Sequence, residues 1–283
     1  MIRIQTIVGM KAEAWRQSAA GRTIGFVPTM GALHEGHLSL VRESRGTAAV
    51  TVVSIFVNPL QFGAGEDLKK YPRNIERDAA LLEKEGVDAL FLPAASEMYP
   101  PGFQTTVEVT RLQENLCGAA RPGHFKGVAT VVLKLLNIVQ PDIAFFGQKD
   151  AQQAVILRRM AADLNLDVSI RIMPIVREPD GLALSSRNAY LSAGERQAAL
   201  VLARSLAEAR RAFEGGERRA AAITARVRDI IAGEPLARVD YVETVGWPDL
   251  ERLEAIDRDV LVAIAVYVGA TRLIDNIILT LKE

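Results

Sequence analysis

Five apolar, β-rich runs alternate with helical patterns along this chain of 283 residues, and this alternation limits the folds that it can adopt. The pattern is typical of a parallel sheet whose strands are connected by helices. Residues 50–57 are almost continuously apolar, which favours a central strand covered by helices on both faces. We expect strands at residues 23–28, 48–57, 88–92, 141–146 and 167–176, and helices at residues 37–45, 72–86, 126–139 and 150–163.

The pattern changes after residues 185–188, where charged helical segments replace the alternation. Two helices are expected at residues 193–214 and 217–232, followed by β-like runs near residues 238–245, 259–268 and 271–280. We therefore predict an α/β protein with two domains. The N-terminal domain, residues 1–177, is expected to hold a Rossmann-like parallel sheet, and the smaller α+β C-terminal domain is expected to span residues 178–283.

Composition indicates a cytoplasmic protein that does not bind nucleic acid through bulk charge. The 34 basic and 34 acidic residues give a formal net charge of zero, so any anion site must be local. The single cysteine, Cys117, excludes an internal disulfide, suits a reducing compartment and is expected in the core. We expect no export segment, because residues 1–5 lack a signal-peptide core, and no membrane segment, because the apolar run at residues 260–269 is too short to span a bilayer.

Between residues 26 and 37 an apolar strand runs into a glycine turn and then into two histidines at a helix start. His34 and His37 are three residues apart and are therefore expected on one helix face. The N–H groups of a first helical turn lack internal partners and favour phosphate oxygens, and Gly36 permits close approach of a nucleotide. Ordinary packing by the two imidazoles is the alternative for this motif alone. A metal site is disfavoured, because His124 and Cys117 are the only other soft ligands.

Three polar motifs follow expected strands of the sheet, at residues 30–37, 58–61 and 147–150. The carboxyl ends of parallel strands meet at one edge of a sheet, where ligands bind. The sequence therefore predicts that these motifs contribute to a common function.

The H-x-G-H tetrad at residues 34–37 is similar to the ATP signature of the nucleotidylyltransferase superfamily. Together with four further segments it resembles the pantothenate synthetase family, and the match covers nearly the whole chain. The segments that carry the resemblance are residues 28–37, 55–63, 116–128, 146–153 and 180–188.

This resemblance implies an ATP-dependent ligase that condenses pantoate with β-alanine. Pantoate would attack the α-phosphate of ATP to give pantoyl adenylate and pyrophosphate, and β-alanine would then displace AMP. The family also implies a homodimer formed mainly through the N-terminal domain. Mg²⁺ would be bound largely through the phosphates of ATP, so no dedicated metal ligands are expected in the chain.

The resemblance also assigns roles to individual residues. His34 and His37 would donate to the phosphates, with His37 as the proton donor, while Lys149 and Arg187 would supply positive charge. The pantoate and β-alanine site would contain Asn58, Gln61 and Gln153. The ATP site would contain Met30, Gly31, Ala32, Leu33, His34, Glu35, Gly36, His37, Gly147, Gln148, Lys149, Asp150, Val176, Leu184, Ser185, Ser186 and Arg187.

Several of these residues have simpler interpretations. Asp150 could be a helix N-cap, and the serines at 185–186 could form an ordinary polar turn. Pro28, Met30 and Phe56 could face the methyl groups of pantoate or the core.

Two positions depart from related patterns. Gln148 stands where many relatives carry glutamate, which argues against a charge-dependent role there, and Arg187 replaces the lysine of the wider superfamily loop.

Two other functions compete with the ligase. One is a nucleotidylyltransferase that transfers a nucleotide to a phosphorylated acceptor and stops there. The other is a regulatory module that binds nucleotide without turnover. A tRNA synthetase is disfavoured, because the chain shows neither an anticodon-binding extension nor an excess of basic residues.

Overall fold

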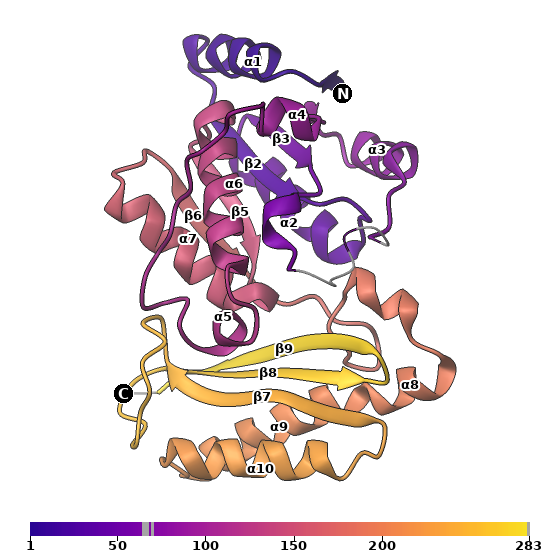
Figure 1. Cartoon of the computed structure of the whole chain (residues 1–283), viewed down its shortest axis with the longest axis vertical. Coiled ribbons are helices and arrows are strands. Elements are labelled where there is room, and N and C mark those ends of the chain that lie inside the picture. The colour runs from indigo at the N-terminus through magenta and orange to yellow at the C-terminus, as the bar shows by residue number, and fades with distance from the viewer. Residues whose placement is uncertain (64–67, 69–70, 282–283) are drawn as a thin grey trace. The chain divides into compact units, whose positions relative to one another are not determined.

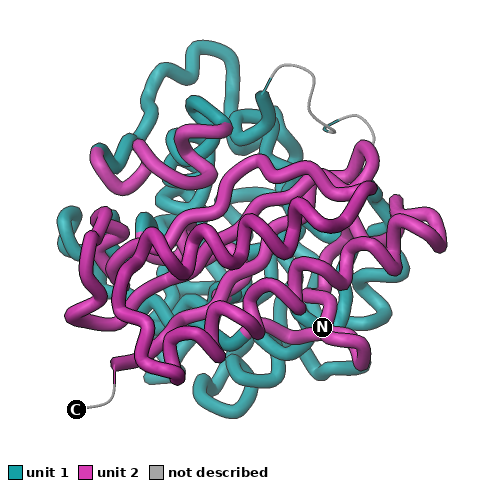
Figure 2. The backbone as a smooth tube through the Cα atoms, turned by 90° about the horizontal axis from the view of Figure 1, so that it is seen from below, with its two compact units in different colours: residues 1–110, 121–147, 156–174 teal, residues 111–120, 148–155, 175–283 magenta. Residues whose placement is uncertain are grey.

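The structure of the chain is a computed structural model that describes residues 1–63, 68 and 71–281 (Figure 1). Its internal contacts divide it into two units, which Figure 2 distinguishes by colour. The first unit consists of residues 1–110, 121–147 and 156–174, and the second of residues 111–120, 148–155 and 175–283. These units differ from the expected domains, 1–177 and 178–283, because residues 111–120, 148–155 and 175–177 group with the second unit.

The first unit contains a six-stranded sheet in which every neighbouring pair of strands is parallel, as predicted. The strand order is β1-β4-β3-β2-β5-β6, so the chain order reverses between β2 and β5. Ligands of open parallel sheets bind beyond the carboxyl ends of the strands at such a reversal. The strands are β1 (Ile2–Ile4), β2 (Ile24–Thr29), β3 (Val50–Ile55), β4 (Ala89–Phe91), β5 (Ile143–Gly147) and β6 (Ser169–Met173).

Side chains from three neighbouring strands form the core on one face of this sheet. Val27, Val53 and Leu90 are in register on β2, β3 and β4 and are fully buried. They belong to one apolar cluster with residues of α2 (Glu35–Thr47) and α3 (Ile75–Lys84). Every residue of β3 is buried, which confirms the prediction of a covered central strand.

Two N-terminal elements, β1 and α1 (Ile7–Ala19), were not predicted. A strand of three residues carries little alternation, and α1 buries only Met10, Ala14 and Gln17, which gives a weak apolar stripe. Helix α1 contacts β2 and α6 (His124–Val139). The other helical elements of this unit are η1 (Pro59–Gln61), α4 (Ala95–Met98) and the part of α7 (Ala151–Asp163) from residue 156 onward.

The second unit is built on an antiparallel sheet in the order β7 (Ala237–Gly246), β8 (Val260–Val268) and β9 (Thr271–Leu279). On one face of β8, Val262 and Ile264 pack in a cluster with residues of α9 (Leu200–Glu214) and α10 (Ala220–Ala232). On the other face, Leu261 and Ala263 pack with Leu116, which lies in α5 (Leu116–Ala120). Burial on both faces explains the uninterrupted apolar run of β8.

The expected helix at residues 193–214 is two helices, α8 (Ala193–Ala198) and α9, which are separated at Ala199. Helix α8 begins at a capping box in which Ser192 and Glu195 each accept from the backbone N–H of the other. Two short helical turns, η3 (Gln148–Asp150) and η4 (Ser186–Tyr190), also belong to this unit. Among the residues that the structure describes, no helix combines the length and apolar character needed to cross a bilayer.

Candidate active site

The turn between β2 and α2 is held in a left-handed conformation by hydrogen bonds to its own N–H groups. Gly31 has a φ of 84° and Ala32 a φ of 52°, a region that residues other than glycine rarely adopt. The Gly31 N–H donates to Thr29 Oγ1 at 3.1 Å, and Thr29 Oγ1 donates to the carbonyl of Ser54 at 2.8 Å. A Cβ atom at Gly31 would lie 3.0 Å from Ile55 and 3.1 Å from Asp78, so a side chain there would disturb the turn.

Asp78, which the sequence did not single out, completes this turn from α3. Its carboxylate accepts from the Ala32 N–H at 2.8 Å and from the Leu33 N–H at 3.0 Å. The residue is 1% exposed; its hydrogen bond to Leu33 is buried and the one to Ala32 is partly buried. A carboxylate that accepts from two backbone N–H groups fixes the turn that leads into His34.

The two histidines of the tetrad cap α2 and contact each other. His34 Nδ1 accepts from the Gly36 N–H at 3.2 Å, and His37 Nδ1 accepts from the His34 N–H at 3.3 Å. Because both Nδ1 atoms act as acceptors, the proton of each neutral imidazole is on Nε2. The ring centroids are 4.1 Å apart, which confirms that the two imidazoles lie together.

This arrangement changes the expected chemistry of the helix start. The N–H groups of Gly31, Ala32, Leu33, His34 and Gly36 all have partners within the chain, whereas we expected such groups to serve a phosphate. In these tautomers the side-chain donors of the motif are the Nε2–H groups of His34 and His37. Glu35, the first residue of α2, forms an ion pair with Arg42.

Asn58 and Gln61 form a second polar cluster after β3. Asn58 is 1% exposed and donates from Nδ2 to Gln61 Oε1 at 3.1 Å. Gln61 Nε2 donates to Met30 Sδ at 3.0 Å, so three of the predicted site residues are in contact. Phe56 is buried just before this cluster, and Pro28 is half-buried in β2.

Residues at the start of α6 and just before α6 hold the backbone of Gln61 in place. His124 Nδ1 lies 2.8 Å from the Gln61 carbonyl, and Arg121 Nη2 donates to the same oxygen at 3.3 Å. Arg121 Nη1 lies 3.0 Å from His124 Nε2, so His124 is a neutral imidazole with its proton on Nδ1. At Gly127 a Cβ atom would lie 2.2 Å from the Leu60 carbonyl, which shows how closely α6 approaches η1.

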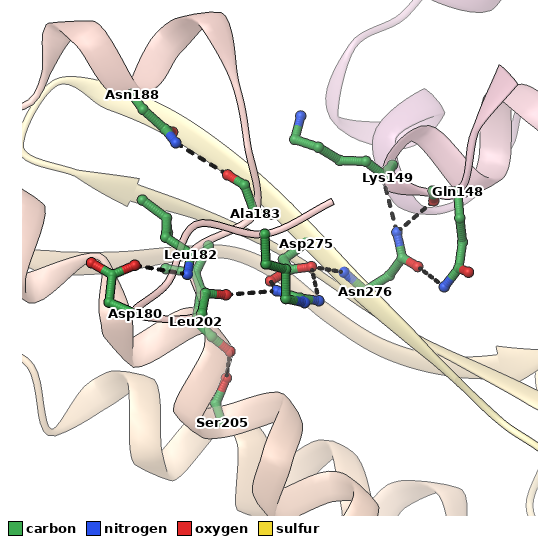
Figure 3. A network of polar contacts seen from close by, with 12 residues as sticks. Gln148, Lys149, Asp180, Leu182, Ala183, Asn188, Leu202, Ser205, Asp275 and Asn276 are labelled. Carbon is green, nitrogen blue, oxygen red and sulfur yellow. Dashed lines mark hydrogen bonds and ion pairs between the residues drawn. The ribbon is translucent and has the colours of Figure 1, made fainter. Parts of the chain in front are cut away.

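In the second unit, Asn276 of β9 holds the segment that carries Lys149 (Figure 3). Its Nδ2 atom donates to the carbonyls of Gln148 at 2.9 Å and Lys149 at 3.0 Å, and its Oδ1 accepts from Gln148 Nε2 at 3.1 Å. Gln148 thus acts as a neutral donor to Asn276. Next to Asn276, the buried Asp275 carboxylate pairs with Arg177 at 2.7 Å.

Lys149 lines a small, narrow hollow within this unit. Its side chain extends from η3 toward the segment of Ala183 and Asn188, and Ser185 also lines the hollow (Figure 3). The structure therefore brings a lysine and the first serine of the 185–188 motif to the same hollow. An ammonium and a hydroxyl are both groups that can donate to an anionic ligand.

The 176–188 segment folds back on itself around this hollow. The Leu184 N–H donates to the Val176 carbonyl at 3.0 Å, and the Arg187 N–H donates to Ser185 Oγ at 3.2 Å. Ser186 and Arg187 lie in η4. Arg196 anchors the loop through Glu178 and Asp180, and its hydrogen bond holds the pKa of the Asp180 carboxyl below its usual range.

Two adjacent glutamines at the start of α7 have different surroundings. Gln152 is buried, accepts from the Cys117 N–H at 2.9 Å and donates to the Leu112 carbonyl at 2.8 Å. Gln153, the predicted ligand residue, is only partly buried, and Asp150 is exposed. Cys117 is buried, as predicted.

The predicted site residues thus form two groups, one in each unit. The first unit holds Met30, Gly31, Ala32, Leu33, His34, Glu35, Gly36, His37, Asn58, Gln61 and Gly147. The second unit holds Gln148, Lys149, Asp150, Gln153, Val176, Leu184, Ser185, Ser186 and Arg187. Within the described residues, no group of three or more His, Cys, Asp or Glu side chains is placed to hold a metal ion.

Comparisons with known sequences find one family over the whole chain. The family model of pantoate-beta-alanine ligase matches residues 3–278. A pantothenate synthetase of Heliobacterium modesticaldum is 58% identical over 275 residues, which are 97% of this chain and 98% of that protein.

Solved structures give the same result. A pantothenate synthetase of Thermus thermophilus superposes with a TM-score of 0.93 at 45% identity and covers 98% of this chain and 99% of its own. A pantoate-beta-alanine ligase of Francisella tularensis, complexed with beta-gamma ATP and beta-alanine, has a TM-score of 0.79 at 32% identity. That match covers 98% of this chain and 97% of the other.

Proposed function

This chain belongs to the pantoate-beta-alanine ligase family, and we propose that it joins its two substrates through a pantoyl adenylate. As a member of this family it is an enzyme that ligates pantoate and β-alanine with ATP. The observation that carries the proposed route is the pair of contacting imidazoles after β2, whose tautomers place the side-chain donor on Nε2.

The proposed reaction has two displacements. A carboxylate oxygen of pantoate attacks the α-phosphorus of ATP, and the bond from that phosphorus to the bridging oxygen of the β-phosphate breaks. Pyrophosphate leaves with the electron pair. The amine of β-alanine then attacks the acyl carbon and loses a proton, and AMP leaves with the carboxylate oxygen that formed the first bond. No side chain is bonded covalently, so positioning and charge stabilisation supply the acceleration.

His34 and His37 act on the phosphates in this proposal. Each Nε2–H can donate to an oxygen whose negative charge grows as pyrophosphate leaves. With ring centroids 4.1 Å apart, the two imidazoles can reach one phosphate chain. His37 lies inside the first turn of α2 and is the proposed proton donor.

Lys149 and Arg187 supply fixed positive charge to the triphosphate. Lys149 already shares a hollow with Ser185, and the Arg187 guanidinium can contact two phosphate oxygens at once. Mg²⁺, when bound, would be held largely by the phosphate oxygens of ATP and would neutralise charge there, because it keeps much of its water and needs few protein ligands. Ser186 and the backbone at Val176 and Leu184 complete the proposed nucleotide contacts.

We assign the binding of pantoate to neutral amide side chains. Gln61, supported by Asn58, and Gln153 can bind the hydroxy acid without adding a charge that would weaken its carboxylate as a nucleophile. Beta-alanine binding is supported by the Francisella tularensis relative, whose structure contains it.

We further infer a cytoplasmic homodimer, because the single cysteine suits a reducing compartment and the family resemblance implies two subunits. Light scattering on the purified protein tests the subunit number, and a monomeric mass at micromolar concentration would contradict it.

Pantoate-dependent exchange of labelled pyrophosphate into ATP tests the proposed function. Exchange without β-alanine is expected for the unchanged protein and requires pantoate; phosphorylated acceptors should not replace it. His37→Ala and Lys149→Ala should each slow exchange about 10²- to 10³-fold. Lys84→Ala, which changes an exposed lysine of α3, is the matched control. Exchange that persists without pantoate, or normal exchange in His37→Ala, would contradict the proposal.

A further inference from the structure

A chain of hydrogen bonds leads from Tyr99 through Asn58 to Gln61, and we propose that Tyr99 orients the Gln61 amide toward pantoate. The inference rests on the proposed function, because it takes Gln61 as a pantoate ligand. All three residues belong to the first unit: Tyr99 follows α4, Asn58 caps η1, and Gln61 ends η1. Tyr99 is a positioning residue in this account, since it acts through Asn58.

The hydrogen bonds of Asn58 determine its amide orientation. Its Oδ1 accepts from the Tyr99 hydroxyl at 2.7 Å and from the Leu60 N–H at 3.3 Å. Its Nδ2 donates to Gln61 Oε1 and to the Gly127 carbonyl, both at 3.1 Å. An asparagine amide has two N–H donors and two acceptor lone pairs, so every one is used. Rotating the amide by half a turn would place oxygen against the Gly127 carbonyl in a buried site, which is unfavourable.

The orientation of Asn58 then fixes that of Gln61. Because Asn58 Nδ2 is a donor, the atom of Gln61 that faces it must be the oxygen. Gln61 Nε2 therefore points to the other side, where its partner in the structure is Met30 Sδ, a weak acceptor. A ligand that displaces this contact meets N–H donors. The amide consequently favours a carboxylate or hydroxyl oxygen of pantoate and disfavours an ammonium group.

Tyr99 is well placed to start this chain of hydrogen bonds. Its ring contacts Phe103 with centroids 5.0 Å apart and Phe56 with centroids 6.1 Å apart, while Lys134 Nζ lies 4.8 Å from the Phe103 centroid. These contacts hold the ring independently of the hydroxyl. Burial raises the pKa of Tyr99, so its hydroxyl remains a donor at the pH values at which the enzyme would be assayed.

The test measures the KM for pantoate in Tyr99→Phe, which keeps the ring and removes the hydroxyl. Loss of one neutral hydrogen bond predicts a KM about three- to tenfold higher, with kcat and the KM for ATP unchanged. Tyr267→Phe, a tyrosine of β8 in the second unit, is the control and should leave all constants unchanged. In a Gln61→Ala background, Tyr99→Phe should have no further effect on the KM for pantoate, because its action passes through Gln61.

Gln61→Glu adds a test of the orientation itself. If Nε2 faces pantoate, the glutamate carboxylate should weaken pantoate binding more than Gln61→Ala does, because an acceptor anion then opposes a carboxylate. Three results would overturn the inference: an unchanged KM in Tyr99→Phe, the same increase in the presence and absence of the Gln61 side chain, or Gln61→Glu activity equal to that of the unchanged protein. Absence of pantoate-dependent pyrophosphate exchange in the unchanged protein would instead refute the proposed function.

Discussion

Replacing Asp78 by asparagine tests whether a buried carboxylate holds the turn that leads into the histidine tetrad. The carboxylate accepts two backbone N–H groups, from Ala32 at 2.8 Å and from Leu33 at 3.0 Å. Asparagine keeps one oxygen for one of these groups and turns an NH₂ toward the other. Hydrogen bonds to charged groups contribute about 1.5–3 kcal/mol, so losing one should favour local opening of the turn by a similar amount.

Hydrogen exchange measures this opening directly. With each 1.4 kcal/mol equal to a factor of ten, amides of the turn should exchange about 10- to 150-fold faster in Asp78→Asn than in the unchanged protein. Peptides that cover residues 30–36 report the effect by mass spectrometry. Asp163→Asn is the control, since Asp163 forms an exposed ion pair with Arg159 in the part of α7 that belongs to the same unit.

Which peptides exchange faster decides whether Asp78 holds the turn or stabilises the whole unit. Faster exchange confined to the turn and the start of α2, together with slower pyrophosphate exchange, would support a positioning role for Asp78. Unchanged protection of the turn would refute the reasoning. Equal acceleration in all peptides of the first unit would also contradict it, because the carboxylate would then stabilise the fold as a whole.

Three further changes test other parts of the site. Asn276→Ala removes two hydrogen bonds from the Gln148–Lys149 backbone and should slow pyrophosphate exchange about tenfold; an unchanged rate would show that Lys149 needs no such support. Arg187→Lys keeps the charge but loses two-point contact, so the KM for ATP should rise about tenfold, and an unaltered KM would argue against phosphate binding by the guanidinium. Chelation of Mg²⁺ should stop exchange and leave the far-ultraviolet circular dichroism unchanged, whereas unfolding would reveal a structural metal site.

The elements that could be predicted from the sequence are those whose burial follows from a local apolar pattern. The apolar run of β3 indicated a strand covered on both faces, and the structure confirms this. The run near residues 259–268 indicated only a strand, and the structure shows that β8 is covered on both faces as well. The break between α8 and α9 at Ala199 was missed because Ala198, Ala199 and Leu200 are all good helix formers and continue the helical pattern. Strand β1 was missed because three residues are too few for alternation to be informative.

The supporting residues of the site could not be predicted, because their partners are distant in the chain. Asp78 and Glu76 fall in the first turn of α3, where acidic residues are common for reasons of the helix dipole alone. Only the fold shows that Asp78 reaches a turn 45 residues earlier. Asn276 likewise contacts Gln148 across 128 residues, and no motif links the two. The tetrad, by contrast, is local, and its imidazoles were correctly expected to lie together.

Transfer of an oxygen atom from pantoate to AMP tests the proposed adenylate most directly. Pantoate labelled with ¹⁸O in its carboxylate is converted to product with unlabelled ATP and β-alanine, and AMP and pyrophosphate are analysed by mass spectrometry. If the carboxylate attacks the α-phosphorus, each AMP carries one labelled oxygen and pyrophosphate carries none. Unlabelled AMP, or label in pyrophosphate, would contradict the reaction proposed for His34, His37, Lys149 and Arg187.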